Sequence, residues 1–212
     1  MKDIPDGRTN YSIWFISPDQ TRNKIGIFTS QASYYSDDLK LIHNLVRISD
    51  NLTINSKLLV SWDTMCPVEL RAKVEQNQAK VDILARYTSR SIRVEAITPQ
   101  GKQKNKIKAE GETYDNEGLI FALRNFILKG VQSKRFWVFN SLNASYAEVE
   151  FMIIGDEIAE VGGDTTEVIR ARLATINGKV PDQYVLFAKQ DSLRFVKSIS
   201  AVQIIELTSH VD

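Results

Sequence analysis

Apolar and polar residues alternate along most of the chain, and this period of two predicts β-strands. The segment VELRAKVE (68–75) has an apolar residue at every second position, and the segments 80–87 and 91–97 repeat that pattern. A strand of this kind buries one face and leaves the other in water, which is typical of antiparallel sheets.

Short polar turns separate the strand segments. The strongest hairpin signal is Asn177-Gly178, because both residues tolerate the positive φ angles of a type I′ turn, and Gly155-Asp156 predicts another turn. We count about a dozen strands, and no shift in composition marks a domain boundary. The predicted fold is therefore mainly β: a single strongly curved antiparallel sheet or open barrel of about a dozen strands, forming one domain over residues 1–212.

One stretch breaks the alternation. In ETYDNEGLIFALRNFI (112–127), Asp115 is a good helix N-cap and Glu117 places a negative charge in the first turn. The residues that follow are apolar around most of the helix circumference, so the helix should be buried on more than one side. We therefore expect a helix at about 116–128, packed in the concave face of the sheet. It either completes the core or forms a movable lid over a ligand cavity.

The alternation also predicts which residues form the core. The expected inward-facing positions are Ile13, Phe15, Ile27, Leu59, Ile83, Val94, Phe121, Leu123, Phe151, Ile153, Leu173, Leu186 and Ile204.

Composition narrows the classes of function. The 27 Lys and Arg residues nearly balance the 26 Asp and Glu residues, so the chain lacks the basic excess that drives non-specific nucleic-acid binding, and no nucleic-acid partner is expected. Cys66 is the only cysteine, which excludes an intrachain disulfide and any metal site built from cysteine pairs. No cofactor is expected.

The N-terminal segment and the hydropathy bear on location. The start MKDIPDGRTN has no apolar signal-peptide region, and no segment approaches the roughly 20 apolar residues of a transmembrane helix. The sequence as given is expected to be a soluble cytoplasmic protein without a transmembrane segment. A location in the cell envelope is the alternative if a leader precedes this sequence.

Candidate catalytic groups are few. Cys66 could act as a nucleophile only with a base such as His43 nearby, and a packed or surface role is expected for both residues. No phosphate-binding loop, zinc spacing or hydrolase motif is present, so the chain is not expected to be an enzyme, and a hydrolase is the least favoured hypothesis. The lysines at every second position of 102–108 are typical of a charged edge strand, with an anion-binding stripe as the alternative.

Three segments carry a resemblance to a known family. IPDGRTNYSIWF near the start, the helix YDNEGLIFALRNF and the closing QYVLFAKQDSLRFVKSISAVQIIEL resemble a bacterial family of uncharacterised, often exported, sheet proteins. The family has a similar helix that starts at Asp, and Phe195 stands here where the family often has proline. The resemblance implies a curved antiparallel sheet, similar in outline to lipoprotein-carrier half-barrels, and it supplies no catalytic residues.

These features favour a non-catalytic module that binds a small apolar or lipid-like ligand in the cavity of the curved sheet. The expected ligand-binding residues are Leu119, Ala122, Leu123 and Phe126 of the helix. No polar cluster in the sequence is suited to hold a polar ligand, so a fatty-acid probe should bind beneath the helix by shape. The alternative is an interaction or structural domain with a filled core and no ligand.

Overall fold

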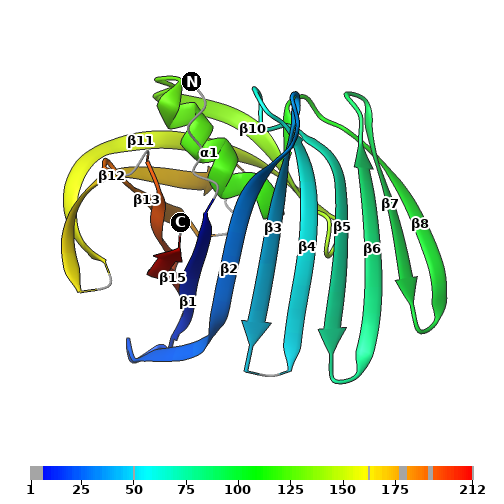
Figure 1. The fold of residues 1–212 in the computed structure, drawn as a ribbon, viewed down its shortest axis with the longest axis horizontal. Helices are drawn as coiled ribbons and strands as arrows, with labels where there is room; N and C mark the ends of the chain where they lie inside the picture. Colours follow the sequence, from blue (N-terminus) through cyan, green and yellow to red (C-terminus); the bar gives the residue numbers. More distant parts are fainter. Residues whose placement is uncertain (1–6, 50, 162, 177–180, 191–192, 212) are drawn as a thin grey trace.

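The computed structural model describes residues 7–49, 51–161, 163–176, 181–190 and 193–211, without the side chains of 209–211. They form one strongly curved sheet that does not close into a barrel, with a short helix against its concave face (Figure 1). The strands are β1 (Arg8–Ile16), β2 (Arg22–Ser36), β3 (Leu39–Ile48), β4 (Leu52–Ser61), β5 (Pro67–Gln76), β6 (Ala79–Tyr87), β7 (Ser91–Thr98), β8 (Gly101–Lys108), β9 (Thr113–Asp115), β10 (Ser133–Asn140), β11 (Ser145–Val161), β12 (Asp164–Thr175), β13 (Gln183–Ala188), β14 (Phe195–Ile199) and β15 (Gln203–Val211).

Strands that are consecutive in the sequence are neighbours in the sheet, except β8 and β9, which lie at its two ends. The last strand, β15, returns to pair with β1, so the order is β8-β7-β6-β5-β4-β3-β2-β1-β15-β14-β13-β12-β11-β10-β9. All pairs are antiparallel except β9 with β10, which is parallel. This confirms the expected curved sheet, with 15 strands where the alternation indicated about a dozen.

The two ends of the sheet approach each other across the interior. Tyr87 of β6 makes an edge-to-face ring contact with Phe139 of β10, at 6.2 Å between ring centroids. Tyr114 of β9 donates a hydrogen bond to the carbonyl of Thr64, just before β5, at 3.4 Å. Strands β9 and β10, at one end of the sheet, therefore face the inner side of β4–β6, and aromatic side chains fill the space between them.

The helix begins where β9 ends. A 3-10 turn, η1 (Asn116–Gly118), leads into α1 (Leu119–Leu128), and the Asp115 side chain caps the turn by accepting a hydrogen bond from the Glu117 amide at 2.8 Å. Gly118 lies directly on the inner face of β3 and β4, where an added Cβ would be 2.7 Å from Leu58 Cδ2. A larger residue would require the Leu58 side chain or the helix to shift.

The far end of the helix is also attached. Lys129 Nζ forms an ion pair with the Asp63 carboxylate at 3.0 Å, and the Asn125 side chain donates to the Asp63 carbonyl at 3.1 Å. With contacts at both ends and Ala122, Leu123, Phe126 and Ile127 buried, α1 packs as part of the core, which favours the first of the two roles considered for it.

Burial confirms most of the expected core. Buried are Ile13, Ile83, Val94, Leu123, Phe151, Leu173, Leu186 and Ile204. Leu186 belongs to a smaller cluster with Val168 and Val196, separate from the main interior cluster. Phe121 and Ile153 are half-buried and pack against the main cluster. Three expected positions are contradicted: Phe15 and Ile27 are exposed, at 43% and 38%, and Leu59 is half-buried outside the clusters.

The errors have two physical causes. Ile27 and Leu59 lie in runs of consecutive apolar residues, where alternation cannot indicate which residue faces inward. Phe28, next to Ile27, faces inward and stacks on Tyr11 at 5.3 Å between ring centroids. Phe15 lies beyond a β-bulge between Ile13 and Trp14, which changes the register at the end of β1.

The turn signals had mixed outcomes. The turn expected at Gly155-Asp156 is wrong, because β11 runs through Gly155, which has a φ of 148° and sits at a register shift against β12. Glycine therefore marks a bulge inside a strand there. Asn177-Gly178 lies outside the described residues.

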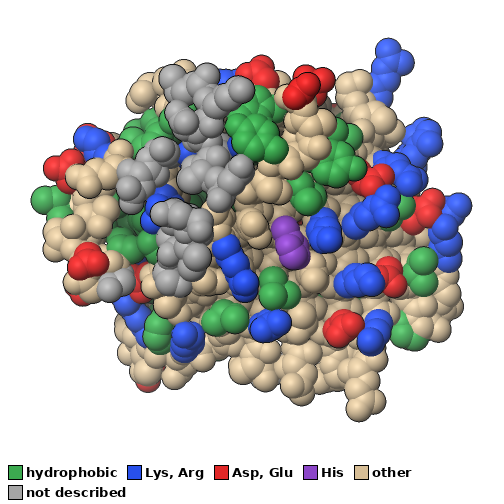
Figure 2. All heavy atoms as spheres, in the orientation of Figure 1, with side chains coloured by type: hydrophobic (Ala, Val, Ile, Leu, Met, Phe, Trp, Pro, Cys, Tyr) green, Lys and Arg blue, Asp and Glu red, His purple; other side chains and the backbone are tan. Residues whose placement is uncertain are grey.

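The convex face is exposed to solvent and carries both positively and negatively charged side chains (Figure 2). Glu69 of β5, for example, pairs with Arg71 at 2.8 Å and with Arg86 of β6 at 3.0 Å. Strand β8 is an edge of the sheet, as its row of lysines indicates, and Lys102 pairs with Glu95 of β7 at 2.6 Å.

Candidate functional site

Two adjoining cavities lie between η1–α1 and the concave face of the sheet. One has a volume of about 140 Å³ and the other about 480 Å³, and both are lined by Asn116, Leu119, Leu173 and Gln183. We call these two cavities together the hollow. The larger cavity falls in the range of roughly 300–1,000 Å³ that is typical of small-molecule sites.

The walls of the hollow are mainly apolar. Leu119 and Leu123 of α1 face Leu173 of β12 and Val185 of β13 across the smaller cavity. Further apolar side chains come from β2, β3, β14 and β15, because the sheet register places Phe28, Val46, Phe195 and Ile205 on the same inner face. The larger cavity continues over β10, β11 and β12 past Val138, Val149 and Leu173.

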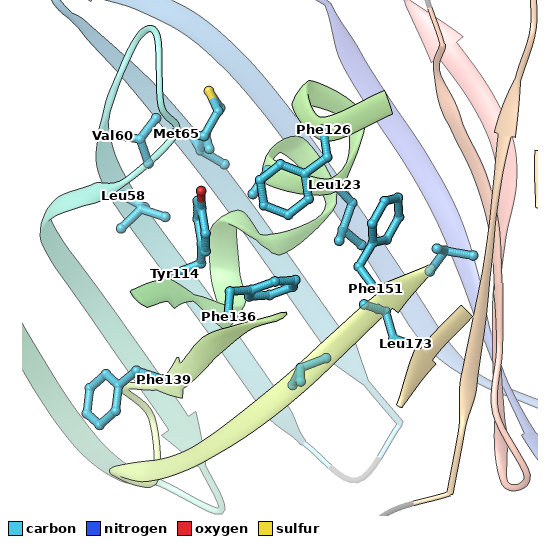
Figure 3. Close-up of a cluster of buried hydrophobic side chains, with 14 of the residues drawn as sticks. Leu58, Val60, Met65, Tyr114, Leu123, Phe126, Phe136, Phe139, Phe151 and Leu173 are labelled. Carbon is cyan, nitrogen blue, oxygen red and sulfur yellow. The ribbon is translucent and has the colours of Figure 1, made fainter. Parts of the chain in front are cut away.

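The four helix residues expected to bind a ligand have two different surroundings. Leu119 and Leu123 line the hollow, whereas Ala122 and Phe126 are buried without lining it. Phe126 instead contacts Tyr114 and Phe136 at 5.4 Å and Phe151 at 5.7 Å between ring centroids (Figure 3). Ala122 is therefore a poor position at which to block the hollow with a larger side chain.

A polar cluster lies on the wall of the hollow, contrary to the expectation that none would be present. Asn44 of β3 donates one hydrogen bond to the Glu117 carbonyl at 2.7 Å and another to Glu117 Oε2 at 3.3 Å. Ser56 of β4 also donates to Glu117 Oε2. Asn44 is itself held by Ser30 of β2, whose hydroxyl donates to its side-chain oxygen at 2.6 Å.

A second carboxyl group lies behind the first. Asp115 is fully buried, and its Oδ2 accepts a hydrogen bond from the Tyr87 hydroxyl. Burial, with the nearby charge of Glu117 as a smaller cause, raises the pKa of Asp115 to about 7. Burial and the Asp115 charge likewise raise the pKa of Tyr87. Both shifts reflect a low-dielectric interior with an excess of negative charge.

The sequence contained a signal for part of this cluster. Asn44 stands between Ile42 and Val46 on the face that alternation assigns to the core, and Ser56 similarly precedes Leu58. A polar residue at a core position needs a hydrogen-bond partner, so such positions point to a buried network. Gln183 and Ser198, which also line the hollow, come from strands far along the chain and carry no local signal.

Other candidate groups are not assembled into a site. His43 faces outward, where its Nε2 lies 2.9 Å from Asn55 Oδ1, whereas Cys66 packs against the interior cluster, so the two do not form a nucleophile–base pair. Within the described ranges, no three His, Cys, Asp or Glu side chains come together as a metal site. Arg124 and Arg194 line a separate cavity of about 40 Å³ that shares Ile120 and Phe195 with the hollow.

Comparisons with known proteins place the fold and leave the function open. No family model and no curated protein matches the sequence. The structure is similar to a β-barrel-like protein of the domain of unknown function DUF1849 from Brucella abortus, with a TM-score of 0.62 and 9% identity over 97% of this chain and 96% of that chain. At this identity the likeness shows the fold alone, and for the fold it confirms the resemblance to bacterial curved-sheet proteins of unknown function. Among the described residues, no helix is long and apolar enough to cross a bilayer.

Proposed function

We propose that this protein is a non-catalytic binding module that holds a small apolar or lipid-like ligand in the hollow. The observation that supports the proposal is the contrast between the buried hydrophobic cluster and a mainly apolar space of about 480 Å³ beside it. Burial of apolar ligand surface there contributes roughly 25 cal/mol per Å², so a small hydrophobic molecule has a sufficient driving force to bind.

The shape of the hollow suits a ligand longer than it is wide. The cavities adjoin at Leu119 and Leu173 and extend from the β2–β3 side toward β10 and β11. An acyl chain or a flat aromatic molecule could lie along the helix with its end near Asn116 and Gln183.

The test is a titration with N-phenyl-1-naphthylamine, an uncharged probe whose fluorescence rises in apolar surroundings. We expect saturable binding at micromolar concentrations in the wild type. Leu119→Trp, which adds bulk at the junction of the two cavities, should weaken it at least tenfold. Leu128→Trp makes the same change on the exposed end of the same helix and should leave binding unchanged.

The second candidate, an interaction or structural domain without a ligand, is supported by the filled part of the core. Phe126, Phe136 and Phe151 occupy the space beside the helix with aromatic contacts. Absence of saturable probe binding, or equal binding by Leu119→Trp and wild type, would refute the ligand-binding proposal and favour this one.

A further inference from the structure

The charge inside the hollow is of one sign. Among the described residues that line the two cavities, Glu117 is the only one that carries a charge. Ser56 and Asn44 donate to its Oε2, and Oε1 has no hydrogen bond to any described residue. Glu117 also forms no ion pair within the described part of the chain.

A carboxylate without a counter-ion attracts a bound cation, and the half-buried position of Glu117 reduces the screening of that attraction by water. Asp115 lies behind Glu117, but with its pKa raised to about 7 by burial it is only partly ionised at neutral pH. A ligand that brought a negative charge into the hollow would face repulsion from Glu117, whereas a protonated amine would be attracted.

Positive side chains near the interior lie elsewhere. Lys40 is on the same face of β3 as Asn44, but its Nζ lies 3.5 Å from the centroid of the Trp62 ring and Lys40 does not line the hollow. Arg124 and Arg194 line the separate cavity of about 40 Å³, which is too small for an acyl headgroup and its chain.

From this charge complementarity we infer that the hollow selects cationic amphiphiles, with the apolar body between Leu119 and Leu173 and a protonated amine on the carboxylate of Glu117. The inference rests on the proposed function and specifies its ligand class. Asn116 and Gln183 supply additional oxygen acceptors for amine protons on the same wall. A fatty acid, the probe suggested by the sequence, is then the least favoured of the simple amphiphiles.

The test uses decylamine, decanol and decanoate, which share a chain and differ in the charge of the headgroup. Each displaces N-phenyl-1-naphthylamine from the wild-type protein at neutral pH, below its micelle concentration. A charge-assisted contact is stronger than a neutral one, so decylamine should bind about tenfold more tightly than decanol, a difference of about 1.4 kcal/mol. Decanoate should bind most weakly.

Glu117→Gln keeps the size of the side chain and removes its charge. It should abolish the preference for decylamine over decanol, with the loss of affinity falling mainly on decylamine. Glu160→Gln, at an exposed position of β11, is the matched control and should keep the wild-type ranking.

The outcomes separate the inference from the function on which it rests. If decanol displaces the probe but decylamine binds no more tightly, or decanoate binds best, the cationic selectivity is wrong while ligand binding stands. If the probe itself shows no saturable binding, both fail. If Glu117→Gln does not fold, the wild-type ranking decides alone.

Discussion

Helix α1 adjoins two regions that differ sharply in how completely they are packed. Around Phe126, Tyr114, Phe136 and Phe151 make mutual ring contacts, and Phe126 lines neither cavity of the hollow. Around Leu119, two turns earlier on the same helix, lie both cavities and the polar cluster of Asn44, Ser56 and Glu117. The comparison indicates that the aromatic region stabilises the fold, and the proposed binding site lies in the other region.

The largest expected effect contrasts truncations in the two regions. Phe126→Ala should reduce the free energy of unfolding by about 3–5 kcal/mol, because it leaves a cavity in close-packed aromatic surroundings. Leu119→Ala should cost less than about 1 kcal/mol, since that side chain already borders open space and loses fewer contacts. Denaturant unfolding of both variants measures the difference, and equal losses would break the comparison. Phe121, which the sequence placed in the core, is half-buried and should fall between the two.

The next effect tests how closely the start of the helix lies on the sheet. Gly118→Ala should destabilise the protein by about 1–3 kcal/mol, because the new Cβ would be 2.7 Å from Leu58 Cδ2. Combining it with Leu58→Ala should cost less than the sum of the two single changes, since the shorter side chain makes room. Strict additivity in thermal or denaturant melts would mean that η1 does not press on β4.

A smaller effect concerns Asp115, which lies behind the polar cluster on the wall of the hollow. Because the pKa of Asp115 is raised from 3.8 to about 7 in the folded protein, the folded state holds its proton more tightly than the unfolded chain does. The stability that this proton supplies is complete below about pH 4 and is lost as the pH rises through about 7. The slope reaches on the order of 1 kcal/mol per pH unit.

Asp115→Asn is the control for this pH dependence. It keeps a side-chain oxygen for the N-cap and cannot ionise, so its unfolding free energy should lack the decline between pH 4 and 7. An identical slope in the variant and the wild type would assign the pH dependence to other groups.

The smallest effect is expected at edge strand β8, which lies away from the two regions compared and serves as a reference for them. Replacing Lys102, Lys104, Lys106 and Lys108 of edge strand β8 with Gln should change stability by less than about 0.5 kcal/mol per residue and leave probe binding unaltered. Self-association should increase, because the charges that keep an open edge from pairing are gone. Sedimentation velocity would detect it, and a variant that stays as monodisperse as the wild type would contradict the edge-guard role.

The sequence predicted the elements better than the site for a physical reason. Alternation and capping are local, so the strands and the helix that follows Asp115 can be read from adjacent residues. Which residues of a strand face the interior is harder to predict where apolar residues are consecutive, as at Leu58, Leu59 and Val60.

The candidate site depends on register across the sheet instead. Asn44 and Ser56 are opposite one another on β3 and β4, and Glu117 reaches them only because η1 lies on those strands. No pattern within a single segment contains that juxtaposition. On the helix itself, apolarity around nearly the whole circumference indicated burial on more than one side, but could not separate Leu119 from Phe126.

The most direct test of the contrast between the hollow and the packed core is a methyl-resolved NMR titration with N-phenyl-1-naphthylamine. The leucine and valine methyl groups report on both regions, since Leu119, Leu123, Leu173 and Val185 line the hollow while Leu58 and Val60 lie in the packed core. We expect saturable shift changes confined to the first set. Shifts in Leu58 and Val60 that match or exceed those of Leu119 and Leu173, or no saturable shifts at all, would contradict the division into a packed region and a binding region.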